Sequence, residues 1–207
     1  MSVSTITIDA APTTGDLTVL ATVRRELELA DAFTADDVWL ADAIRQASDA
    51  IASYCRRPEG FGRATVTQSW RLTRDPPYLM LKRDLAPSVS SVVEDGAALA
   101  STDWLLDGSL LHRLRSDAPG PWTASKVVAS YTAGYDLLDD VPFDLERACL
   151  DLVVRGYRSR GRDPGLRSQD VPDVLRQSWD TPGGAGFRDG LPRDVADRLA
   201  PFRRHDL

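Results

Sequence analysis

The hydrophobic period of the sequence changes twice along the chain, and this pattern limits the folds that the chain can adopt. Up to about residue 58, and again after about residue 140, apolar residues recur at the spacing of an α-helix, whereas residues 63–132 alternate with a period of two. A helical period gathers apolar side chains on one stripe, and a period of two gathers them on one face of a strand. The pattern predicts an α+β fold with a β region inserted between helical segments.

Three segments carry the helical period. The first covers residues 17–29, and the second runs from a capping Thr34 to Cys55 with acidic residues in its first turn. The third follows Val141-Pro142, where a proline suits the first turn of a helix. Its apolar stripe is the most regular in the chain and contains Leu145, Ala148, Cys149, Leu152, Val153, Gly156 and Tyr157.

Strand signals fill the stretch between the second and third helices. In residues 64–72, Val66, Trp70 and Leu72 share one face, and threonine and serine residues alternate with them. Further on, Asp107-Gly108 is a strong signal for a two-residue hairpin turn between two short apolar runs. These residues predict a small antiparallel β region.

We therefore predict a mainly α-helical core of three to four helices, with an inserted small antiparallel β region and a long irregular C-terminal arm that ends in a short helix. The predicted ranges are a flexible N-terminal arm at 1–16, a helical core at 17–58 and 132–162, a β insertion at 63–131, and the C-terminal arm at 163–207.

The composition is that of a globular protein with an acidic surface. The 207 residues suffice for one large domain, and such a chain needs no disulfide or metal to fold. The net charge of −6 argues against a protein that grips nucleic acid by its phosphates, but it is compatible with a protein that DNA passes. There is no apolar run of membrane-spanning length and no signal-peptide pattern at the N-terminus, so we expect no membrane partner and synthesis in the cytoplasm.

Catalytic residues and metal ligands are not evident in the sequence. His112 and His205 are the only histidines, and neither has a partner at ligand spacing. Cys55 and Cys149 lie among apolar neighbours, as is typical of buried reduced thiols. The glycines at 183–186 lack the lysine and the strand–helix frame of a phosphate-binding loop. We predict no catalytic residue, no metal site and no cofactor, and a protein that is not an enzyme.

Two groups of residues are candidates for protein–protein contacts. Arg158, Arg160 and Arg162 form a basic group in an otherwise acidic chain, where they either complement a helix C-terminus or dock an acidic partner. The short C-terminal helix has an apolar face that must be buried on its own domain or on another chain. The second group consists of Leu191, Val195, Leu199, Phe202, Arg203 and Arg204.

Three separated segments resemble the head-to-tail adaptor family of long-tailed bacteriophages and gene transfer agents. Residues 23–58 resemble an opening helix, an acidic break and a long alanine-rich helix that ends in an aromatic residue and arginine. Residues 131–160, beginning YTAGYDLLDDVPF, resemble the run of AGY, acidic residues, VP and an apolar helix. Residues 191–204, LPRDVADRLAPFRR, resemble the terminal LP, short helix and PYR ending, although Phe202 stands where that ending often has tyrosine.

The resemblance implies a structural subunit of a ring, twelvefold in the particle, that lies below the portal protein. Such a ring holds packaged DNA in the head, lets DNA pass without sequence-specific binding, and offers a surface for the stopper or tail protein. The protein would be located in the neck of a virion or phage-like particle, and in the host cytoplasm during assembly. The C-terminal group of residues would then contact the portal, and the arginine group would take part in assembly.

Other functions remain open on the sequence. A stopper or tail-completion protein of the same connector would also form a ring. A small soluble enzyme with an unrecognised site, or a regulatory helix bundle with a β ligand domain, would belong to a different class. Enzymes usually gather polar groups with perturbed pKa values in one pocket, whereas this sequence scatters its aromatic residues and arginines.

Overall fold

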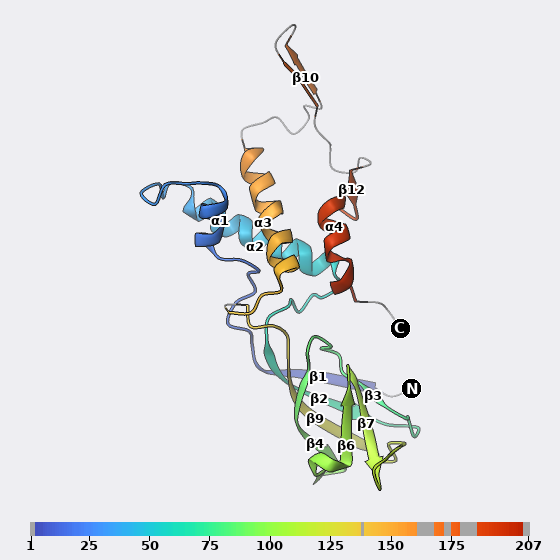
Figure 1. Cartoon of the computed structure of the whole chain (residues 1–207). Coiled ribbons are helices and arrows are strands. Elements are labelled where there is room, and N and C mark those ends of the chain that lie inside the picture. The colour runs from blue at the N-terminus through green and yellow to red at the C-terminus, as the bar shows by residue number, and fades with distance from the viewer. Residues whose placement is uncertain (1–2, 138, 161–167, 172–174, 179–185, 205–207) are drawn as a thin grey trace. The chain divides into compact units, whose positions relative to one another are not determined.

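The computed structural model describes residues 3–137, 139–160, 168–171, 175–178 and 186–204, with side chains for all of these except 168–171 and 175–178 (Figure 1). The chain forms two compact units. Residues Met1–Thr14 and Phe61–Asp140 make up one, here called the β unit, and Gly15–Gly60 and Val141–Leu207 make up the other, here called the helical unit. The 63–131 range of the predicted β insertion thus lies in the β unit, together with the N-terminal residues.

The β unit contains two antiparallel sheets. The first has the order β1-β2-β9-β4-β5 and consists of β1 Val3–Ala10, β2 Ala64–Arg71, β9 Lys126–Ala133, β4 Ser88–Glu94 and β5 Ala97–Ala98. The second has the order β3-β7-β6, with β8 also paired to β7, and consists of β3 Leu79–Met80, β6 Trp104–Asp107, β7 Leu110–Arg115 and β8 Ala118–Gly120. A hairpin forms where it was predicted, but its two-residue turn is Gly108-Ser109 and not Asp107-Gly108, since Asp107 ends β6 and faces Leu110 of β7.

The core of the β unit follows from the period of two. Residues along β2 alternate between buried and half-buried as far as Trp70, as the sequence predicted for Val66 and Trp70, and Arg71 at the end is exposed. Gln68 is fully buried on the same face. Its amide donates to the Met80 carbonyl (3.1 Å), and its side-chain oxygen accepts from the Lys82 amide (2.9 Å) and the Tyr131 hydroxyl (2.8 Å). A buried polar group must be paired, and here the pairing ties the segment around β3 to the first sheet.

Two glycines allow three segments of the β unit to cross. Gly134 has a φ of +107°, and a Cβ there would meet the backbone of Gly62. A Cβ on Gly62 would in turn meet Pro12 at 2.6 Å. Only glycine combines a positive φ with so close an approach of backbones. This crossing explains why glycine stands between Ala133 and Tyr135 in the AGY run.

The helical unit contains α1 Leu20–Glu26, α2 Asp37–Tyr54, α3 Phe143–Arg158 and α4 Arg193–Leu199, followed by a 3-10 turn at Ala200–Phe202. It also contains two short hairpins, β10 Ser168–Val171 with β11 Leu175–Ser178, and β12 Phe187–Arg188 with β13 Leu191–Pro192. Helix α3 crosses α2 and lies beside α4 (Figure 1).

Packing in the helical unit corrects one detail of the predicted stripe. Leu145, Cys149 and Val153 of α3 are buried as predicted, but Leu152 is only half-buried. Leu150, outside the stripe, is buried instead. Helix α3 contacts both α2 and α4, so it buries more than one side of its surface. None of the helices in the described residues has the length and apolar character of a membrane span.

The prediction of a mainly helical core with a small β insertion is wrong. Strand residues outnumber helical residues in the described part of the chain, and β1–β9 form a unit with its own extensive core. The sequence prediction gave most weight to the three regular helical stripes, whereas the strands are individually short and gain their core only when two sheets meet.

The N-terminal residues also differ from their prediction as a flexible arm. Val3–Ala10 form β1, which pairs with β2 along its length. The serine and threonine residues of VSTITIDA look like a polar tail, but they alternate with isoleucines, and threonine and isoleucine both favour strands.

Candidate assembly surfaces

The apolar face of the C-terminal helix is buried within the helical unit. Leu191, Val195 and Leu199 are almost fully buried there, and Phe202 is half-buried. The Tyr54 hydroxyl, at the end of α2, donates to the Ala196 carbonyl (3.2 Å). The structure therefore covers this face with the chain's own residues, and the contact of these four residues with a portal protein stays a prediction.

The two arginines after α4 hold the C-terminal segment to the end of α2. The Arg203 guanidinium lies over the Tyr54 ring at 5.1 Å and pairs with Asp189 at 3.3 Å. Arg204 pairs with Glu59, and its backbone amide donates to the Cys55 carbonyl (2.9 Å). Such partners orient both guanidinium groups within the unit, and neither side chain is fully exposed.

The predicted arginine group is only partly brought together. Arg158 is exposed in the last turn of α3, and Arg162 lies outside the described residues. Arg160 pairs with Asp36 (2.8 Å), and its guanidinium lies over the rings of Trp39 (4.7 Å) and Tyr157 (5.4 Å). We infer that Arg160 ties the end of α3 to the start of α2.

Asp36, the acidic partner in this cluster, was not predicted from the sequence. The hydrogen bond from Arg160 lowers the pKa of the Asp36 carboxyl, and the bond from the Tyr157 hydroxyl (2.7 Å) lowers it further. The same bond raises the pKa of Tyr157. No spacing in the sequence connects residues 36 and 160, which become neighbours only because α2 and α3 cross.

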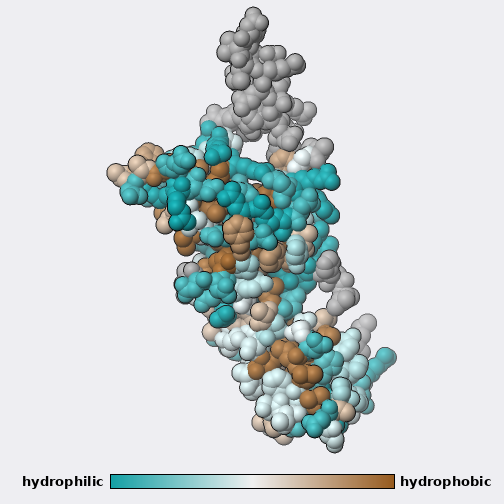
Figure 2. Space-filling view, viewed as in Figure 1, coloured by the Kyte–Doolittle hydropathy of each residue, from teal (hydrophilic) through white to brown (hydrophobic). Residues whose placement is uncertain are grey.

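An exposed apolar patch, here called the strand patch, covers the outer face of β3, β7 and β6. Met80 faces Leu110, and Leu105 faces His112, across neighbouring strands. Tyr78 lies 6.0 Å from the His112 ring, and Tyr78, Met80 and Leu105 are each about half exposed. Figure 2 shows hydrophobic side chains gathered over β6 and β7. Contiguous exposed apolar surface of this kind usually marks an interaction site.

The sequence contains a signal for the strand patch. Residues 105–106 and 110–111 are pairs of consecutive leucines within short strands. Adjacent strand residues point to opposite faces, so such pairs place one leucine in the core and the other on the outer surface. Leu111 is indeed fully buried, and Leu105 is exposed.

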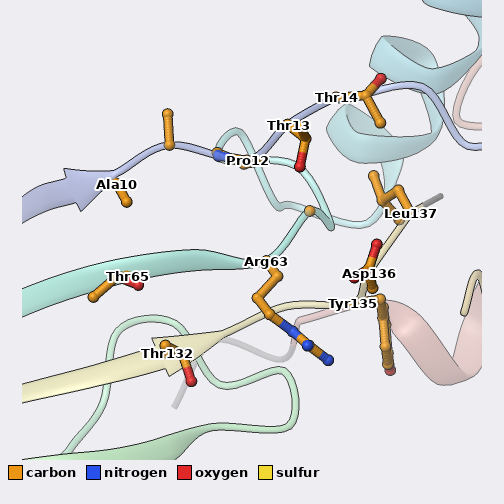
Figure 3. Close-up of a pocket in the computed structure, with 12 residues that line it drawn as sticks. Ala10, Pro12, Thr13, Thr14, Arg63, Thr65, Thr132, Tyr135, Asp136 and Leu137 are labelled. Atoms are coloured by element: carbon orange, nitrogen blue, oxygen red, sulfur yellow. The ribbon is translucent and has the colours of Figure 1, made fainter. Parts of the chain in front are cut away.

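A pocket of about 200 Å³ lies in the β unit at the start of β2 and the end of β9. Thr65 and Thr132 line it from these strands, Thr13 from the segment after β1, and Arg63 and Asp136 from the loops (Figure 3). Its described lining has no histidine, cysteine or lysine. In the part of the chain that the structure describes, no three His, Cys, Asp or Glu side chains are placed to hold a metal ion.

The two cysteines are free and buried in the helical unit. Burial raises the pKa of the Cys55 thiol to about 11 and that of the Cys149 thiol to about 12. Since the thiolate is the reactive form of cysteine, neither side chain has the properties of a nucleophile at neutral pH.

Comparison with known proteins gives a match at the level of structure. No protein-family model and no curated protein matches the sequence. The fold matches a chain in a structure described as the neck of an empty gene transfer agent (GTA) particle computed with C6 symmetry, at 18% identity and a TM-score of 0.57, over 98% of this chain and 97% of that chain.

The chain has the fold of a GTA neck chain. A second match, to a chain in the neck of a native GTA particle computed with C12 symmetry, has 17% identity and a TM-score of 0.52 and covers 97% of each chain. A third, in the virion of the native GTA particle, has 18% identity and a TM-score of 0.53. The resemblance to head-to-tail connectors is thereby confirmed for the fold, and the neck fold includes both units.

Proposed function

We propose that the chain is a structural subunit of the neck of a virion or phage-like particle. The observation that carries this proposal is the match in fold to GTA neck chains over nearly the whole length of both chains. Those necks were computed with C6 and C12 symmetry, as expected of ring assemblies.

Within the neck, we assign the chain to the adaptor ring directly below the portal protein. Twelve copies would form the ring, retain packaged DNA in the head, and present the attachment surface for a stopper or tail protein. DNA would pass without sequence-specific contacts, in keeping with the net charge of −6. The chain would act through its interfaces, with no catalytic residue, and would occupy the host cytoplasm only until assembly.

The exposed features of the two units provide surfaces for this role. The strand patch supplies an apolar contact on the β unit. Arg158 supplies a positive charge on the helical unit. Contacts from Leu191, Val195, Leu199, Phe202, Arg203 and Arg204 to a portal would require the end of the helical unit to dock as a folded surface, because these residues already pack against or pair with the unit itself.

Electron microscopy of the full chain bound to the portal protein of the same element tests the assignment. We expect a ring of twelve copies attached to the portal. A ring that binds only to a preassembled portal–adaptor complex would instead identify the chain as a stopper, which is the second candidate because stoppers also form rings in connectors. Mutation-sensitive turnover of a phosphoester or peptide substrate by the purified chain would contradict both assignments.

A further inference from the structure

The first sheet of the β unit ends in two open edges. Among the described strands, β1 pairs only with β2, so the other side of its eight residues has no neighbouring strand (Figure 1). At the opposite edge, β5 pairs only with Val93 and Glu94 of β4. The outer side of β4 from Ser88 to Ser91 therefore also lacks a paired strand within the described residues.

The edge of β1 is poorly protected against pairing. Proteins usually guard an exposed edge with charges, prolines or bulges, because its free backbone groups pair readily with another strand. Residues 3–8, VSTITI, contain no charge, proline or glycine. A register shift between Ile8 and Ala10, and a hydrogen bond from the Lys82 ammonium to the Ser4 carbonyl (3.0 Å), lie at the two ends of the strand. The middle of β1, including Thr5 and Thr7, has neither of these protections against pairing with another strand.

The two open edges match each other in the character of their faces. Thr5 and Thr7 on β1 lie on the same face of the sheet as Ser91 on β4. The row from Thr7 to Ser91 runs through Thr67 of β2 and Ser130 of β9, whereas the row from Thr5 runs through Ser69 to Val128 and Val93. On the other face, Ile6 of β1 and Val89 of β4 both pack against the core. If β1 of one copy paired with β4 of another, the continued sheet would keep the hydroxyl residues Thr7 and Ser91 on one face and the apolar residues Ile6 and Val89 on the other.

The strand directions match as well. Neighbouring strands of the sheet are antiparallel from β1 through β2 and β9 to β4, so β4 runs opposite to β1. Copies related by rotation about an axis near the strand direction would place β1 of one copy antiparallel to β4 of the next. Contact between two different edges is heterologous, and heterologous contacts that close produce rings.

We propose that β1 of each copy pairs with β4 of the next copy in the assembled ring, so that one sheet continues from subunit to subunit. The pairing rests on the proposed function, because it requires copies of the chain to assemble in a ring. It would cover Ile8, which is 55% exposed at the open edge. A second copy fits better than an unrelated strand, since this chain supplies both the open edge and an edge with the same two faces.

An edge charge tests the pairing. Ile8→Lys places an ammonium group at the open edge, as natural edge strands do, and Ile8 is exposed enough for the fold to tolerate it. We expect the melting temperature to stay unchanged and the yield of rings on the portal to fall by about tenfold or more. A tenfold loss corresponds to the loss of about one or two net backbone hydrogen bonds. Val38→Lys is the matched control, because Val38 is an exposed apolar residue of the helical unit, and this variant should form rings normally.

A cross-linking experiment tests the partner strand directly. In the full chain carrying Thr7→Cys and Ser91→Cys, a flexible bis-maleimide should give a ladder of covalent oligomers up to the closed ring, both on the portal and in concentrated protein. Chains with Thr7→Cys and Val38→Cys should give no such ladder. Cys55 and Cys149 add no background because both are buried and protonated at neutral pH.

The possible outcomes separate this proposal from the proposed function. Normal rings with Ile8→Lys, and no ladder from the Thr7/Ser91 pair, would overturn the strand pairing while the neck assignment stands. Cross-linked dimers from Thr7→Cys alone would replace it with a symmetric β1–β1 contact. A ladder without portal binding would support the pairing and contradict the adaptor role. If the full chain gives no cross-linked ladder and forms no ring, both the strand pairing and the neck assignment are overturned.

Discussion

Gly134 lies at the crossing of three segments in the β unit, and its backbone conformation leaves no room for another residue. Its φ of +107° disfavours any side chain, and a Cβ would meet the backbone of Gly62. We expect Gly134→Ala to lower the free energy of unfolding by about 2–4 kcal/mol, from the positive φ and the steric overlap together. Urea denaturation measures this change.

Gly108 provides the control for that prediction. It also has a positive φ, of +57°, but an added Cβ would meet nothing within 4 Å. Gly108→Ala should therefore cost only about 1 kcal/mol, from the backbone conformation alone. Equal losses in the two variants would show that the crossing at Gly62 does not constrain Gly134.

Asp36 should titrate below its ordinary range. The hydrogen bond from Arg160, followed by that from Tyr157, lowers its pKa from 3.8. A carboxyl with a lowered pKa in the folded state contributes stability that is present above pH 3.8 and is lost as the pH falls through the folded-state value. Carboxyl NMR should show an Asp36 pKa below 3.8 in the native chain and a higher pKa in Arg160→Ala, where the bond from Tyr157 still lowers it. A pKa that does not respond to this substitution would contradict the contact.

At the scale of the elements, individual strands and helices could be predicted from the sequence better than the proportion of strand to helix in the whole fold. The alternation around Val66 and the turn signal at Asp107-Gly108 predicted β2 and the β6–β7 hairpin, because those signals are local. The strand at Val3–Ala10 was missed, since an edge strand buries little and its alternation is between hydroxyl and apolar residues. The size of the β unit was missed because two sheets build its core from residues far apart in the sequence.

Helix α4 has a role in stability that its length does not suggest. A helix of seven residues is not stable alone in water, yet Val195, Ala196 and Leu199 are fully or almost fully buried. Deleting residues 191–207 would expose the surfaces of α2 and α3 that they cover. We expect the truncated chain to lose at least about 3 kcal/mol, the cost of removing one or two buried aliphatic side chains. Differential scanning calorimetry measures the loss.

A milder variant distinguishes the contribution of the helix from that of the residues after it. Arg203→Ala with Arg204→Ala keeps α4 but removes the contacts to Asp189, Tyr54 and Glu59. These side chains are partly exposed, so their loss should cost less than that of the buried apolar face. If the truncated chain melts at the same temperature as the full chain, the apolar face of α4 is available to a partner. Burial of this face on another chain is the alternative that the sequence left open.

At the scale of the whole molecule, the sequence indicated the neck fold through three short segments and not through any site. The AGY run marks the backbone crossing at Gly134, and the LP ending marks the buried start of the segment that leads into α4. The AGY run and the LP ending are both required by the fold itself. For this reason they could be recognised in the sequence without knowledge of the function. The strand patch and the two sheet edges carried no such motif, because exposure depends on which residues the rest of the molecule leaves uncovered.

Arg158 is the member of the predicted arginine group that tests an interface role most directly. It is exposed in the last turn of α3, whereas Arg160 is engaged by Asp36. Arg158→Glu puts a negative charge at a helix C-terminus, which should cost about 0.3–1 kcal/mol and lower the melting temperature by about 1–4 °C. If Arg158 faces an acidic partner, like-charge repulsion should weaken association with the portal by about tenfold or more.

Arg25→Glu is the matched control for this last prediction. Arg25 is also exposed and lies in the last turn of α1, so its reversal carries the same cost at a helix terminus and the same change in net charge. Both variants should therefore melt slightly earlier than the native chain, and only Arg158→Glu should lose portal affinity in a binding titration at constant salt. Equal affinities in the two variants would mean that Arg158 only complements the helix dipole, and the predicted assembly contact would then have to come from the strand patch or the sheet edges.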